Sequence, residues 1–93
     1  TLRKCGDKGI SVGEDTKADF KKIEVSESNI GLASKDSSSV VVGNSYIYDV
    51  KNCYASYKKK QEFNGGQIKI NKSICKNFDN EIYVDNFSSI KIQ

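Results

Sequence analysis

The stretch SSSVVVGNSYI, residues 37–47, places three consecutive valines between a serine run and a Gly-Asn pair. A β-strand with one solvent-exposed face alternates apolar and polar side chains, because successive residues point to opposite faces. Val40, Val41 and Val42 break this alternation, yet their run is too short to form a long buried strand. The fold therefore depends on what covers these valines.

The other apolar residues occur mainly in short pairs whose members are separated by one residue. With the valines, these pairs are Ile10/Val12, Ile23/Val25, Ile30/Leu32, Val40/Val42, Ile68/Ile70, Ile82/Val84 and Ile90/Ile92. A period of two predicts short strands, and the Ser, Asn, Asp, Gly and Lys residues between them predict turns. We expect an all-β chain.

The pairs belong to a longer repeat, whose period is the equal spacing of Ile10, Leu32 and Tyr54 along the chain. A second series consists of IEV from 23, VVV from 40, IKI from 68 and IKI from 90. Its first step is shorter than the period, its second is longer, and its third equals the period. We interpret SYKKKQEFNGG, residues 56–66, as a loop inserted in the longest step, and the shortest step as lacking a segment.

Short strands and polar turns at this period predict a β-solenoid, in which equivalent residues of successive coils stack about 4.8 Å apart. Each coil buries its inward side chains only against its neighbours. Val40 and Val42 would then point inward, onto the pairs that we expect before and after them. Those pairs are Ile23/Val25 and Ile68/Ile70. Val41 would point outward, in a row with polar residues of other coils: Glu24, Lys69 and Lys91.

The stretch from Ile23 to Ile92 resembles right-handed parallel β-helix repeats of the pectin-lyase-like superfamily. The segments NIGLASKDSSSVVVGNSYI (29–47) and NCYASYKKKQEFNGGQIKI (52–70) are similar to coils of large bacterial surface or secreted proteins. The resemblance implies one right-handed segment of about four coils over residues 1–93, located outside the cell or on its surface. The abrupt end in SSIKIQ suggests a piece of a longer solenoid, and the opening TLRKCGDKG lacks the apolar stretch of a signal peptide.

The charge pattern argues against nucleic-acid binding, and the lengths of the apolar runs argue against a membrane span. The net charge of +3 comes almost wholly from lysine, since Arg3 is the only arginine. Nucleic-acid-binding proteins usually rely on arginine and on one concentrated basic face. No apolar run approaches the roughly 20 residues of a membrane span. We therefore expect neither nucleic-acid binding nor a membrane span.

Catalytic residues are hard to find in this sequence. The lyases of the β-helix family use an Arg or Lys base with calcium held by carboxylates, and the hydrolases use paired aspartates. The chain has no histidine and no Asp-Asp pair, and Asp79 with Glu81 fits a solvated turn better than a catalytic or metal site. We expect no catalytic residue, metal or cofactor here. The alternative is a fragment of a polysaccharide lyase or hydrolase whose catalytic residues lie outside this chain.

The three cysteines have no CxxC spacing, which argues against a structural zinc site. Cys53 and Cys75 are separated by one period of the repeat, so we expect them to stack in neighbouring coils. We interpret both as small buried hydrophobic residues. A disulfide between them is the alternative, and it requires suitable Cβ geometry.

Outward aromatic residues with polar neighbours are candidates for binding sugars, whose rings stack on aromatic faces. They are Tyr46, Tyr48, Tyr57, Phe63 and Tyr83. The inserted loop is the best single site, through Tyr57, Lys58, Lys59, Lys60 and Phe63, with an acidic polysaccharide as the ligand. A plain solvated loop is the alternative, since lysines also protect exposed edges. A third interpretation is a protein-interaction scaffold that self-associates through uncapped coil ends.

Overall fold

The computed structural model describes residues 2–58 and 64–93 and is all-β, as predicted. It contains five strands: β1 (Leu2–Val12), β2 (Lys17–Lys35), β3 (Ser39–Tyr57), β4 (Gln67–Val84) and β5 (Ser89–Ile92). All neighbouring strands pair in parallel, and their order in the sheet is their order in the chain. None of the described residues belongs to a helix long and apolar enough to cross a membrane.

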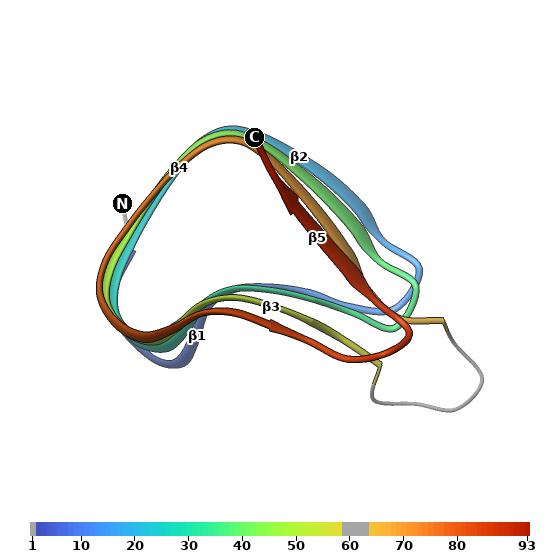
Figure 1. The fold of residues 1–93 in the computed structure, drawn as a ribbon, viewed down its shortest axis with the longest axis horizontal. Helices are drawn as coiled ribbons and strands as arrows, with labels where there is room; N and C mark the ends of the chain where they lie inside the picture. The colour runs from blue at the N-terminus through green and yellow to red at the C-terminus, as the bar shows by residue number, and fades with distance from the viewer. Residues whose placement is uncertain (1, 59–63) are drawn as a thin grey trace.

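The long strands β2, β3 and β4 bend, so that the chain follows a three-sided path and each strand overlies the one before it (Figure 1). This parallel arrangement is compatible with a β-solenoid. Inward side chains of successive strands form a continuous core along the stack. Its largest buried members include Val25, Leu32, Val40, Val42, Ile47, Tyr54, Ile68 and Ile70.

One bend is produced by the same backbone conformation in three successive strands. Glu27, Asp49 and Asn77 all have positive φ, of 54°, 58° and 53°. The register on either side aligns these three residues, because residues 26, 48 and 76 pair, as do 28, 50 and 78. Asp and Asn tolerate this left-handed region better than most residues. The Asn77 side-chain amide also donates a 2.6 Å hydrogen bond to Asp49 Oδ1, which links β3 and β4 at the bend.

The series Ile10, Leu32 and Tyr54 is confirmed, since these residues pair in register and the row continues to Ile82. The long step from Val40 to Ile68 is also confirmed, because these two residues pair directly. Glycine is required where the chain enters β4, because a Cβ atom on Gly66 would lie 2.0 Å from the Ser34 carbonyl oxygen.

The predicted partners of the valines are wrong on one side. Val40 does stack on Ile68, and Val41 is outward and 44% exposed. On the other side, however, Val40 pairs with Ala18, and Val42 pairs with Phe20. Ile23 and Val25 pair instead with Ser45 and Ile47.

The error arises because each long strand contributes more than one inward pair. The pair Ala18/Phe20 includes a small residue that the apolar pattern overlooked. The step into the valines runs from Ala18 to Val40 and equals the period of the repeat, so no segment is missing. Glu24 is likewise not in the outward row of Val41. Glu24 pairs with Tyr46, and Asp19 pairs with Val41.

The cysteines form a disulfide between Cys53 and Cys75, with a Cα–Cα distance of 6.4 Å. They do not stack at equivalent positions as predicted, because Cys75 pairs with Ile47 rather than with Cys53. The insertion lengthens the step from β3 to β4 beyond the period, so a separation of one period no longer marks equivalence between these strands. The disulfide thus joins different positions of neighbouring strands and replaces the interpretation as separate buried hydrophobic residues.

Candidate functional site

The predicted loop site lies only partly within the described residues. Tyr57 ends β3, is half-buried and packs edge-on against Tyr83, with ring centroids 6.3 Å apart. The Lys58 ammonium lies 4.1 Å from the centroid of the Phe87 ring. Both residues thus contact neighbouring parts of the protein. Lys59, Lys60 and Phe63 lie outside the described residues, and their role in binding stays a prediction.

Asp85 holds the start of this loop against the turn between β4 and β5. Its carboxylate accepts hydrogen bonds from the backbone N–H of Lys58 (2.7 Å), from the N–H of Phe87 (3.0 Å) and from Ser88 Oγ (2.7 Å). Desolvation acts to raise the pKa of Asp85, but these hydrogen bonds and the Lys58 charge outweigh it and lower the pKa. Asp85 and Lys58 therefore stabilise the turn.

The other predicted candidates are dispersed. Tyr46 and Tyr48 are half-buried on β3, with ring centroids 5.0 Å apart. Asp79 and Glu81 are exposed on β4. Within residues 2–58 and 64–93, no group of three His, Cys, Asp or Glu side chains is arranged to hold a metal ion.

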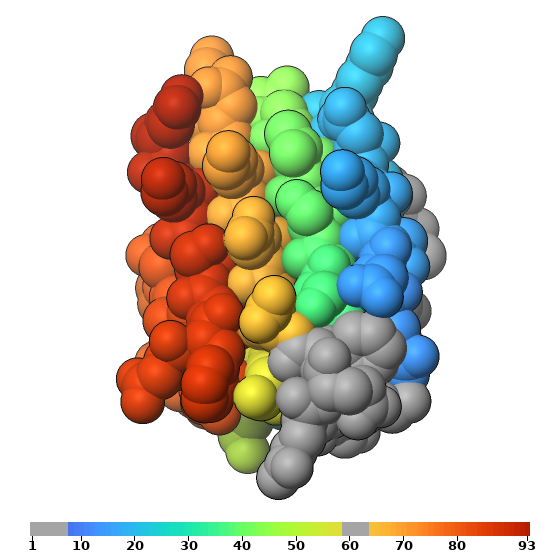
Figure 2. Space-filling view, turned by 90° about the vertical axis from the view of Figure 1, so that its right-hand side faces the viewer, coloured from blue at the N-terminus to red at the C-terminus, as the bar shows by residue number. Residues whose placement is uncertain are grey.

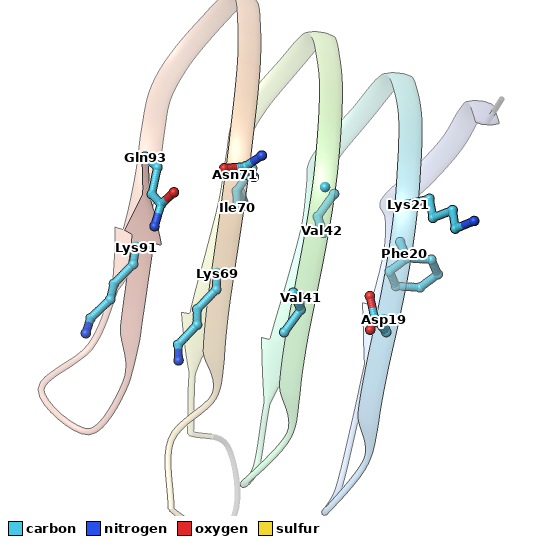
Figure 3. Close-up of a pocket in the computed structure, with 11 residues that line it drawn as sticks. Asp19, Phe20, Lys21, Val41, Val42, Lys69, Ile70, Asn71, Lys91 and Gln93 are labelled. Atoms are coloured by element: carbon cyan, nitrogen blue, oxygen red, sulfur yellow. The ribbon is translucent and has the colours of Figure 1, made fainter.

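A groove lies on the outer face formed by β5 and the first residues of β2, β3 and β4. Figure 2 shows this face of the molecule, and Figure 3 shows residues that line the groove. Its larger part has a volume of about 550 Å³ and an adjoining part about 440 Å³, and both include Gln93. We call these two parts together the lysine groove. Its lysines are Lys21, Lys22, Lys69, Lys72 and Lys91.

The parallel register arranges the residues of the lysine groove in rows. Asp19, Val41, Lys69 and Lys91 pair in succession and form the first row. Figure 3 shows the side chains of Val41, Lys69 and Lys91 next to one another on successive strands. A second row contains Lys22, Asn44 and Lys72. Groups far apart in the chain thus lie at the spacing of neighbouring strands, about 4.8 Å.

Gly43 shapes the floor of the groove. A Cβ atom at this position would lie 2.7 Å from the Lys21 carbonyl oxygen, so only glycine permits this close approach of the backbones. The residue therefore leaves a low point between the flanking side chains. The Gly-Asn pair after the valines is part of the groove, since Asn44 lines its smaller part.

The groove concentrates positive charge. Asp19 is the only carboxylate among its lining residues, which include five lysines. Lys69 and Lys91 are directly opposite each other on β4 and β5. Like charges opposite each other on neighbouring strands are destabilising. A bound anion would relieve this repulsion.

The neutral polar groups of the groove suit a hydroxylated ligand. Asn44, Asn71 and Gln93 provide side-chain amides, which both donate and accept hydrogen bonds. Tyr46 adds an aromatic ring at one side of the smaller part. Together with the lysines, these groups can bind a molecule that carries both carboxylates and hydroxyl groups.

Sequence reasoning missed this groove as a site, although it predicted Lys69 and Lys91 to be outward. The signal was the lysine between two isoleucines in both IKI segments, 68–70 and 90–92. Lys21 and Lys22 could be added only with the correct pairing of β2 with β3. Comparison with known proteins found no matching family model, curated protein or solved structure. The lysine groove is therefore the feature from which we infer a function.

Proposed function

We propose that the chain is a segment of a right-handed parallel β-helix of about four coils that binds an acidic polysaccharide in its lysine groove and is not itself catalytic. Its strands stack in parallel and in register along a three-sided path (Figure 1). The chain runs anticlockwise in that view as it approaches the viewer, which is the sense of a right-handed coil. These features support the pectin-lyase-like type of β-helix.

The observation that carries the binding proposal is the in-register pair Lys69 and Lys91 in a groove with one carboxylate. Two ammonium groups at the spacing of adjacent strands favour a ligand with repeated negative charges. A chain of acidic sugars offers such charges, and its hydroxyl groups match the amides of the groove. Sugar rings can also stack on Tyr46.

A place in a bacterial extracellular or surface protein fits the same proposal. Disulfides form and persist mainly in oxidising environments, such as the cell exterior. The Cys53–Cys75 disulfide supports such a location. Polysaccharides are also common ligands there, so the compartment and the ligand class agree.

The test is a binding titration with polygalacturonate, with neutral dextran as the comparison ligand. We expect binding to polygalacturonate that weakens as salt rises, because surface charges are screened over about 8 Å at physiological ionic strength. The double variant Lys69→Ala/Lys91→Ala should bind roughly tenfold more weakly, if each lost ion contact contributes up to about 1 kcal/mol.

The matched control is Lys51→Ala/Lys76→Ala, which removes the same charge from exposed residues outside the groove. It should retain most of the affinity. Equal losses in the two double variants would mean that only net charge matters and would contradict the proposal. A loss confined to Tyr57→Ala/Phe63→Ala would instead place the site on the inserted loop.

A further inference from the structure

β3 forms an uncharged strip between two basic strands in the lysine groove. Its outward residues there are Val41, Gly43, Asn44 and Tyr46. Asn44 pairs with Lys22 of β2 on one side and with Lys72 of β4 on the other. These two lysines are two strand spacings apart, about 10 Å. This spacing leaves room for one polymer chain along β3, with an ammonium group on either side.

The two parts of the lysine groove meet at Gly43. The larger part contains residues 41–43 of β3, and the smaller part contains residues 44–46. The register places Gly43 between Lys21 of β2 and Asn71 of β4, and glycine alone of the three lacks a side chain. A chain that follows β3 therefore passes from one part to the other over this low point.

The aromatic surface of β3 continues beyond the lysine groove. Tyr46 lines the smaller part of the groove, and Tyr48 is the next residue of β3 on the same face. Ile47, between them, is fully buried, so both rings point outward. The two tyrosines are half-buried, and their ring centroids are 5.0 Å apart. We call Tyr46 and Tyr48 the tyrosine platform.

The tyrosine platform offers ring faces rather than net charge. Tyr46 pairs with Glu24 of β2, and Tyr48 pairs with Lys76 of β4. The one carboxylate and the one ammonium group in these pairs offset each other. Because aromatic rings stack on other flat or apolar surfaces, the platform suits the apolar face of a sugar ring.

We propose that the acidic polysaccharide runs along β3, with its acidic groups between the lysines of β2 and β4 and its next sugar rings on the tyrosine platform. This inference rests on the proposed function and adds Tyr48 as a sugar-binding residue outside the lysine groove. A strand rises about 3.3 Å per residue, so Val41 and Tyr48 are up to about 23 Å apart along β3. The ligand is thus a chain of several sugar residues, bound by charge at one end of this path and by stacking at the other.

The charges of the groove favour this direction over a path across the strands. A chain that followed the first row from Lys91 over Lys69 and Val41 would reach Asp19, the one carboxylate among the described residues of the lining (Figure 3). An acidic group of the ligand would be repelled there. On the path along β3, Lys69 borders the ligand directly, and Lys91 adds its charge from the next strand.

The test is a titration of Tyr48 variants with polygalacturonate at several salt concentrations. Tyr48→Leu removes the ring but keeps an apolar side chain, and it should bind roughly fivefold more weakly than wild type. Tyr48→Phe keeps the ring and should bind like wild type. Because stacking is not ionic, the fold-change of Tyr48→Leu should stay constant as salt rises, whereas that of Lys22→Ala/Lys72→Ala should shrink. A melting curve of each variant checks that it is folded.

A fluorescent reporter tests the ring contact directly. The chain has no tryptophan, so Tyr48→Trp introduces a single indole. Tyr83→Trp is the matched control, since Tyr83 is exposed and lies outside the groove lining. Polygalacturonate should change the emission of the Tyr48→Trp variant and leave that of the Tyr83→Trp variant unchanged.

The results distinguish this inference from the proposed function. The path along β3 is overturned, and the proposed function stands, if Lys69→Ala/Lys91→Ala weakens binding while Tyr48→Leu binds like wild type and the Tyr48→Trp emission does not respond. A full effect of Lys69→Ala/Lys91→Ala with none of Lys22→Ala/Lys72→Ala, or an equal response of the two reporters, would also overturn the path. A wild-type chain that does not bind polygalacturonate overturns both.

Discussion

Replacing Val40 by alanine, and separately Val41 by alanine, removes the same atoms from two adjacent residues with opposite orientations. Val40 is fully buried between Ala18 and Ile68, whereas Val41 is 44% exposed. At about 0.8 kcal/mol per buried carbon group, Val40→Ala loses about 1.6 kcal/mol of transfer free energy. The cavity left behind raises the expected loss of unfolding free energy to about 2–3 kcal/mol.

Val41→Ala should cost less than about 1 kcal/mol, because much of that side chain is already in contact with water. In a domain of this size, about 1 kcal/mol corresponds to about 4–8 °C in melting temperature. The two variants should therefore differ by about 10 °C in thermal unfolding followed by circular dichroism. Equal melting temperatures would refute the assignment of Val40 to the core and Val41 to the surface.

Three other changes test the stabilising contacts. Reducing the Cys53–Cys75 disulfide should lower the free energy of unfolding by about 3 kcal/mol, because the unfolded chain is then no longer closed into a loop between two cysteines that are 22 residues apart. An unchanged denaturation midpoint would contradict this expectation. Tyr54→Phe should cost about 1–2 kcal/mol, since the buried hydroxyl bonds two serine hydroxyls, whereas Tyr83→Phe, at an exposed ring, should not change the midpoint. The Asp85 carboxylate contributes to the free energy of unfolding. This contribution is complete above the pKa that Asp85 has in the unfolded chain, and it is lost as the pH falls through the lower pKa of Asp85 in the folded protein. Asp85→Asn should therefore flatten this part of the acid unfolding curve, and an unchanged curve would show that the carboxylate contributes nothing.

The alternation of short apolar pairs was enough to predict an all-β chain and the orientation of the valines. The predicted strand lengths were wrong, because many polar residues assigned to turns lie within the long, bent strands β2, β3 and β4. The alternation was not enough to assign the neighbours of the valines, because every long strand has several inward pairs that look alike in sequence. Ala18 and Phe20 fill the position below the valines, and alanine carries little apolar signal. Only the backbone path decides which pair of the preceding strand lies below Val40.

The lysine groove was beyond prediction for a related reason. Its charged residues come from strands separated by unequal steps along the chain, so a small error in register moves each lysine to another row. The same inserted residues make Cys53 and Cys75 look equivalent when they are not. The loop itself was visible as an interruption of the repeat, whereas the groove arises only when regular strands are stacked.

The most direct test of polysaccharide binding in the lysine groove is a titration of the ¹⁵N-labelled chain with polygalacturonate, followed by the chemical shifts of its backbone amides. We expect the largest shift changes on residues 19–23, 41–46, 69–74, 91 and 93, which are far apart in the chain but line one groove. Shift changes centred on residues 57–58 and 83–87 would contradict binding in the lysine groove. The absence of any shift change at concentrations where dextran also has no effect would contradict it as well.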